Sequence, residues 1–268
     1  MRRFIVLLIL LLSVSLSAGT MHIVTPYLGR LDNNLEVTSN GQTLKLDDSA
    51  LMEGVYYLCI NPAKFQWNIF IYGSQDINSS HLFGTHLIYD RYFQHSESGR
   101  YAIGVGLDFL QIKTDADELQ GLQDFKMTNN ITAPYIRAGR YFNFTQGINR
   151  YSVFLWGGFE RDVIRGDVDF TISNPMMPFP VSVSSEIDSD YHYALAGLAL
   201  KGTFYHFLEI KVKYHRKFSL DDKDSFHVFS AMTNVYMSRK WGVSYRFKHM
   251  EETFGDNVYH IGGVFYVF

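Results

Sequence analysis

Apolar and polar residues alternate along most of this chain with a period of two. The segment 207–217 shows it most clearly, because one face carries only Leu208, Ile210, Val212 and Tyr214. The opposite face of the same segment carries Glu209, Lys211, Lys213 and His215. A period of two is that of a β-strand, whose side chains point alternately to its two faces. Helical periodicity is hard to find, so the pattern predicts an all-β fold.

The alternation predicts twelve strands. Their ranges are 21–31, 51–60, 65–74, 80–93, 101–112, 130–143, 150–162, 187–200, 207–217, 226–237, 241–249 and 258–268. A strand needs about 9–11 residues to cross a bilayer. Twelve such strands and their connections account for most of the 268 residues, with ten or fourteen strands as the alternatives.

Short and long connections alternate along the chain. The short ones are 61–64, 96–99, 145–149, 202–206 and 238–240. The other set comprises 32–50, 114–128 and 163–186, with shorter members at 75–79, 219–225 and 252–257. Outer-membrane barrels have short turns on the periplasmic side and longer loops outside. The sorting therefore predicts an antiparallel transmembrane β-barrel with both chain ends on the periplasmic side.

The amino-terminal residues predict export. Arg2 and Arg3 precede the apolar run 4–12, and small residues follow up to Ala18 and Gly19. This order is typical of a secretory signal peptide. We expect residues 1–19 to be removed and residues 20–268 to form a single barrel domain in the bacterial outer membrane.

The carboxyl terminus resembles that of bacterial outer-membrane proteins. The chain ends in Gly262-Gly263-Val264-Phe265-Tyr266-Val267-Phe268. In that class a terminal aromatic residue, with apolar residues at alternate positions before it, is the signal read by the outer-membrane assembly machinery. The resemblance implies this role for Tyr266 and Phe268. Since lipid offers no partner for unpaired backbone groups, the last strand should pair with the first. Pro26 and Pro134 each lack a backbone donor, which predicts that they lie near a rim or a bulge.

Composition fits a sheet with one face in lipid. The chain holds 18 Tyr and 22 Phe at a mean hydropathy of only -0.07. Because apolar and polar residues alternate, a hydropathy averaged over both faces of the strands does not show the apolar face. Cys59 is the only cysteine, so no intramolecular disulfide forms. Without Arg2 and Arg3 there are 22 basic and 27 acidic residues, which gives no indication of a nucleic-acid partner. The sequence shows no metal-ligand spacing and no cofactor motif, and the expected partners are outer-membrane lipid and, in a channel, small solutes.

If the apolar rows face lipid, the opposite rows face the lumen. His86 and Asp90 then point inward, whereas Arg137 and Arg140 cannot both do so. The main candidates for lumen-facing functional residues are Asp108, Glu160, Asp162, Asp190, His192, Glu209, Lys211, Lys213, His215, Arg246 and Lys248. Acidic residues dominate one arc and basic residues another, which favours a narrow channel for passive diffusion of small polar or charged solutes. The alternative for the interior is that acids and bases pair and fill it.

Two other functions remain open. A barrel that transports nothing could act structurally or bind a surface partner through loops 32–50 and 163–186. The third is proteolysis. Glu160-x-Asp162 and Asp188-x-Asp190-x-His192 flank the longest loop, and the second element is similar to the Asp-x-Asp-x-His of omptin-type outer-membrane proteases. In that family an acidic pair and an Asp–His pair face each other and activate water. Here the two elements lie on adjacent strands, and nothing else aligns.

Overall fold

The computed structural model describes residues 19–39, 42–74, 80–96, 98–119, 122–172, 180–221, 224–252 and 255–268. The predicted signal peptide, residues 1–19, lies outside these ranges except for Gly19. Within the described ranges, no helix has the length and apolar composition needed to cross a membrane.

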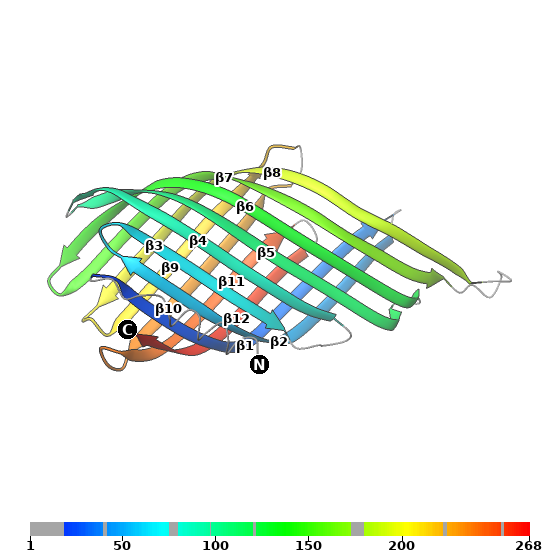
Figure 1. Cartoon of the computed structure of the whole chain (residues 1–268), viewed down its shortest axis with the longest axis horizontal. Helices are drawn as coiled ribbons and strands as arrows, with labels where there is room; N and C mark the ends of the chain where they lie inside the picture. Colours follow the sequence, from blue (N-terminus) through cyan, green and yellow to red (C-terminus); the bar gives the residue numbers. More distant parts are fainter. Residues whose placement is uncertain are drawn as a thin grey trace.

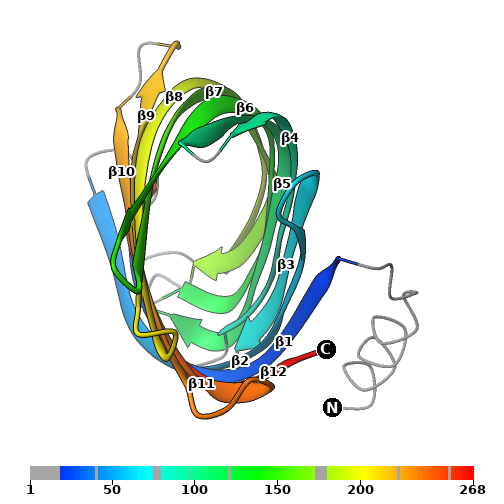
Figure 2. The same ribbon diagram turned by 90° about the vertical axis from the view of Figure 1, so that its left-hand side faces the viewer.

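Twelve strands form one closed antiparallel barrel in which each strand pairs with its neighbours in sequence (Figures 1 and 2). They are β1 Met21–Ser39, β2 Gln42–Asn61, β3 Phe65–Ser74, β4 Ser80–Ser96, β5 Gly99–Leu119, β6 Leu122–Gln146, β7 Asn149–Ile172, β8 Val181–Phe204, β9 Leu208–Ser219, β10 Phe226–Tyr236, β11 Trp241–Glu252 and β12 Gly255–Val267. The predicted count of twelve is confirmed. The strands run obliquely around the barrel, as closure of a sheet requires.

The ring closes between β1 and β12, as predicted. The ladder runs from the pair Ile23↔Val267 to the pair Leu35↔Gly255. At its end the Phe268 amide donates to the His22 carbonyl at 2.9 Å. The Tyr266 and Phe268 rings point outward, each more than two-fifths exposed, and meet edge to face at 4.8 Å. The terminal aromatic pair therefore lies on the outer surface beside the closing seam.

Pro134 differs from its prediction, because it lies at the centre of β6 with no bulge beside it. The pairs Thr132↔Val163 and Tyr135↔Glu160 flank it in an unchanged register. Pro134 has no backbone N–H to donate, and the β6–β7 ladder has no pair at this position. Pro26 sits in a similar gap of the β1–β12 ladder, again without a register shift.

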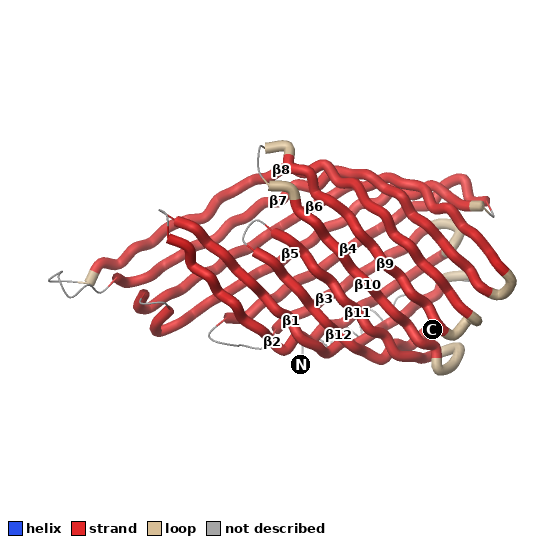
Figure 3. The backbone as a smooth tube through the Cα atoms, turned by 180° about the vertical axis from the view of Figure 1, so that it is seen from behind, coloured by secondary structure: helices blue, strands red, loops and turns tan. Residues whose placement is uncertain are grey.

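The three longest predicted loops are mostly strand. The β1–β2 ladder continues to Ser39↔Gln42, the β5–β6 ladder to Leu119↔Leu122, and the β7–β8 ladder to Ile172↔Val181. These hairpins project from one end of the barrel, which we call the hairpin end, and β7 with β8 extends furthest (Figures 1 and 3). The opposite end carries the tight connections and is called the short-turn end. Beyond the lipid neither face of a strand has to be apolar, so the sequence pattern fades where the strand continues.

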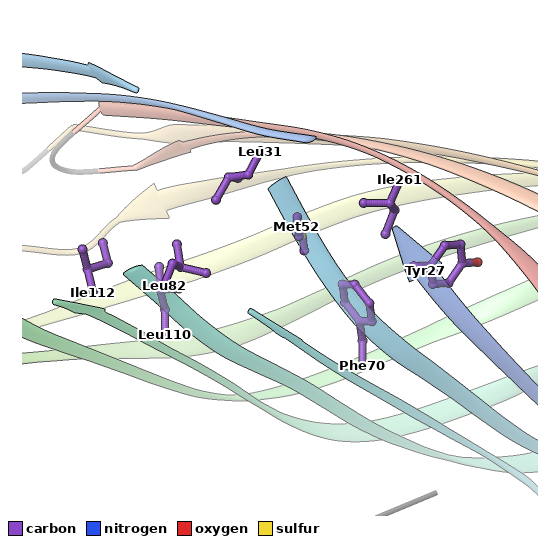
Figure 4. Close-up of a cluster of buried hydrophobic side chains, with 8 residues drawn as sticks. All are labelled: Tyr27, Leu31, Met52, Phe70, Leu82, Leu110, Ile112 and Ile261. Carbon is purple, nitrogen blue, oxygen red and sulfur yellow. The ribbon is translucent and has the colours of Figure 1, made fainter. Parts of the chain in front are cut away.

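The two faces of the wall have opposite character. Large apolar side chains on the outer face are about half exposed, among them Leu28, Val105, Ile136, Leu155 and Phe159. The inner face buries an apolar cluster from six strands, shown in Figure 4: Tyr27, Leu31, Met52, Phe70, Leu82, Leu110, Ile112 and Ile261. A second inward cluster, around Trp156 and Tyr193, lies against β7 and β8. The interior is therefore partly filled by side chains rather than uniformly open.

Candidate functional site

Alternation fixes which predicted residues line the interior. On β7 the buried Trp156 faces inward and Leu155 outward, so Glu160 and Asp162 share the inner face. On β9, His215 is 9% exposed and its neighbour Tyr214 is 42% exposed. On β11 the buried Ser244 lies between the exposed Val243 and Tyr245, so the even-numbered residues of this strand face inward. The structure thus places these predicted residues inside: Asp108, Glu160, Asp162, Glu209, Lys211, Lys213, His215, Arg246 and Lys248.

Asp190 and His192 face outward, which differs from the prediction. On β8 the buried side chains are those of Tyr193 and Leu195, so the even-numbered positions point away from the interior. Asp190 accepts hydrogen bonds from Arg161 on the outer face, at 2.9 Å from Nε to Oδ1. The prediction failed because it took the row opposite Asp190 and His192 as the lipid face, whereas that odd-numbered row, with Tyr193 and Leu195, is buried inside the barrel.

The same placement separates the two elements of the omptin-like motif. Glu160 and Asp162 lie on the inner face of the wall, whereas Asp190 and His192 lie on its outer face. Facing acidic and Asp–His pairs therefore do not form from these residues. Among the described residues, no three His, Cys, Asp or Glu side chains are grouped so that they could hold a metal ion.

The most deeply buried ion pair among the described residues joins Asp90 and Arg137. Their side chains are 1% and 7% exposed. Arg137 Nη2 donates to both carboxylate oxygens, at 2.9 Å to Oδ1 and 2.7 Å to Oδ2, and Nε donates to Oδ1 at 3.0 Å. Gly104 makes room for the pair, since a Cβ there would lie 2.2 Å from Asp90 Oδ1. Arg140 points outward over Tyr101 and Phe142, so only one of the two arginines is inside, as their odd spacing requires.

The other inward acids also have basic partners. Asp108 hydrogen-bonds His86, Lys217 pairs with Glu160, and Lys201 Nζ lies 2.7 Å from Glu209 Oε2. Lys217 is also 3.4 Å from Asp162 Oδ2. Neither Lys217 nor Lys201 is among the predicted lumen-facing residues. One further step of the alternation from His215 reaches Lys217, whereas Lys201 lies on the odd-numbered row of β8, which the prediction had assigned to the lipid face.

Three basic side chains on β9 and β11 meet aromatic rings instead. Arg246 Nε donates to the Tyr27 hydroxyl at 2.6 Å, and its guanidinium carbon lies 3.6 Å from the centre of the Tyr56 ring. Lys213 Nζ lies 5.1 Å from the Trp156 ring, and Lys248 Nζ lies 5.9 Å from the Tyr259 ring. Such contacts stabilise a cation without neutralising it.

Comparison with known proteins identifies the class of barrel. No protein-family model and no curated protein matches the chain. Among solved structures, the translocator domain of the autotransporter NalP from Neisseria meningitidis gives a TM-score of 0.52 at 12% identity, over 98% of this chain and 93% of that one. The transport unit of the autotransporter AIDA-I from Escherichia coli gives 0.48 at 8% identity, over 95% and 92%. The P. putida toluene transporter TodX gives 0.45 at 10% identity, over 94% and 90%. At such identities the similarity to the NalP domain shows the fold alone: the chain is a twelve-stranded bacterial outer-membrane β-barrel.

Proposed function

We propose that this barrel is a narrow channel for passive diffusion of small polar or charged solutes. The observation that carries the proposal is the exposure of Asp108 and His86 inside the barrel. Both side chains point inward from the middle of their strands, yet they are 39% and 28% exposed. An inward side chain is exposed only where the interior leaves space beside it for water. A wholly packed interior would instead bury them as it buries Asp90.

The size of the solute follows from what shares the interior. Twelve strands leave more room than eight, because barrel width grows with strand number. Two inward clusters of apolar and aromatic side chains take up part of that room. The remaining passage is lined by charges, which selects for solutes that are small and hydrophilic.

Planar-bilayer recording tests the proposal. Refolded protein should insert and give discrete single-channel steps in KCl. Insertion is checked independently, because a folded barrel migrates differently from the boiled protein on a gel. Protein that inserts and carries no current would refute the channel.

A surface-binding function is the second candidate, and the projecting hairpins favour it. β8 begins at Val181, but its ladder with β9 starts only at the pair Tyr193↔Ser219. Residues 181–190 therefore have no strand partner on that side among the described residues, and an open strand edge can accept another chain. Shortening the β7–β8 hairpin by residues 167–186 should leave conductance unchanged. Loss of conductance after this deletion would count against separate roles for the wall and the hairpins.

A further inference from the structure

Basic side chains gather on the inner faces of β9 and β11, on either side of β10. The β-ladders fix their arrangement in two rungs across these strands. One rung is Lys211, Met232 and Arg246, and the next is Lys213, Ser230 and Lys248. Neighbouring strands lie about 4.8 Å apart and alternate residues about 7 Å apart along a strand. The Cα atoms of the two β9 lysines thus lie about 10 Å from those of Arg246 and Lys248 on the same wall, with Ser230 on the strand between them. We call these five residues the cationic patch: Lys211, Lys213, Ser230, Arg246 and Lys248.

The patch carries more positive charge than its surroundings neutralise. The inward acids nearby are paired with other bases, namely Asp90 with Arg137, Asp108 with His86, Glu160 with Lys217 and Glu209 with Lys201. Within the described part of the chain, Lys211, Lys213 and Arg246 form no ion pair with a carboxylate. Lys211 is also the direct cross-strand partner of Lys201. Like charges placed opposite one another destabilise a sheet, and Glu209 compensates Lys201 but not Lys211.

We propose that the cationic patch binds the carboxylate or phosphate group of a small anionic solute in the lumen. The anion lies over β10, with the lysines of β9 on one side, the basic residues of β11 on the other and Ser230 beneath it. Charge-assisted hydrogen bonds of this kind are the strong ones in proteins. The proposal rests on the proposed channel function, because the solute must enter through the water-accessible lumen.

Calorimetry on the refolded protein in zwitterionic detergent at low salt tests the site. Succinate and inorganic phosphate are the probes, and uncharged succinamide is the matched control ligand. We expect saturable binding of at least one anion, no binding of succinamide, and weaker binding as KCl rises. Binding of succinate alone assigns the site to carboxylates, and binding of phosphate alone assigns it to phosphates. Binding of neither anion, or binding that does not respond to salt, would overturn the proposal.

Variants locate the site. Lys211→Gln with Lys213→Gln removes two charged donors and should weaken binding at least about tenfold. Arg161→Gln is the matched control, because it removes a cation from the outer face of the wall and should leave affinity unchanged. Equal affinity in the double variant would place the anion elsewhere and overturn the assignment. The gel-mobility shift reports whether each variant has folded.

The same preparations separate this inference from the channel itself. Single-channel current without saturable anion binding would overturn the site and leave the channel standing. Saturable binding at the patch without current would refute the channel while supporting the site. The two proposals therefore fail on different readouts.

Discussion

Replacing Asp90 should destabilise the barrel far more than replacing a similar carboxylate on its outer face. Asp90 and Arg137 form a bidentate pair through three hydrogen bonds, with side chains 1% and 7% exposed. The Phe154 and Trp156 rings lie 5.7 and 5.6 Å from the guanidinium carbon and close the space around it. Asp90→Ala would leave the Arg137 charge in a space that water scarcely reaches.

The expected magnitude follows from this burial. Removing one partner of a buried ion pair typically costs about 3–5 kcal/mol, because the remaining charge has no compensation. We expect a loss of that size for Asp90→Ala. Adding Arg137→Met to Asp90→Ala should recover part of the loss, since the unpaired charge is then gone and an apolar chain fills its place.

Arg161 and Asp190 supply the control, because they form the same kind of pair on the outer face with side chains 56% and 40% exposed. Exposed pairs contribute about 0–1 kcal/mol, so Asp190→Ala should cost little. The free energy of unfolding is measured by guanidinium titration of the refolded protein in detergent, with fluorescence and gel mobility as two probes. Equal losses for Asp90→Ala and Asp190→Ala would refute the buried pair as a major stabilising contact.

Three further predictions concern assembly, the lipid face and ion preference. Deletion of Phe268 should lower the amount of protein assembled in the outer membrane far more than the ~1.5–3 kcal/mol of one buried Phe suggests; normal assembly would show that the terminal residue is incidental. Leu155→Arg, at a lipid-facing position 49% exposed, should cost about 2–4 kcal/mol of folding free energy in vesicles; a neutral result would mean that this face does not meet lipid. Lys211→Glu with Lys213→Glu should shift the reversal potential in a KCl gradient toward cations, whereas Arg161→Glu should not; failure of the double variant to insert would place both lysines on the lipid face.

The sequence predicted the wall of the barrel well, because lipid imposes one apolar face on every membrane-spanning strand. All twelve strands and the closing pair of β1 with β12 followed from alternation and from the sorted connections. The prediction failed where that constraint ends. β7 and β8 continue as a regular hairpin to Ile172 and Val181, in a region that was predicted to be loop. Outside the bilayer both faces of a hairpin meet water, so polarity no longer reveals the period.

The interior was harder to predict than the wall. Alternation gives the face of a side chain only when the register of its strand is correct, and β8 shows the consequence for Asp190 and His192. Pairing across the lumen depends on which strands curve toward one another. The pair of Asp90 with Arg137 joins residues 47 apart in sequence and on non-adjacent strands, and no local pattern contains that information.

Thiol labelling tests the central claim most directly, which is that a water-accessible lumen lies inside a lipid-facing wall. In a Cys59→Ser background, Asp108→Cys introduces a thiol on the inner face of β5 and Val105→Cys introduces one on its outer face, where Val105 is 52% exposed. Refolded protein in lipid vesicles is treated with a charged, membrane-impermeant thiol reagent. The thiol at position 108 should react rapidly and the thiol at position 105 should stay protected by lipid. Protection at position 108 with reaction at position 105 would contradict the account.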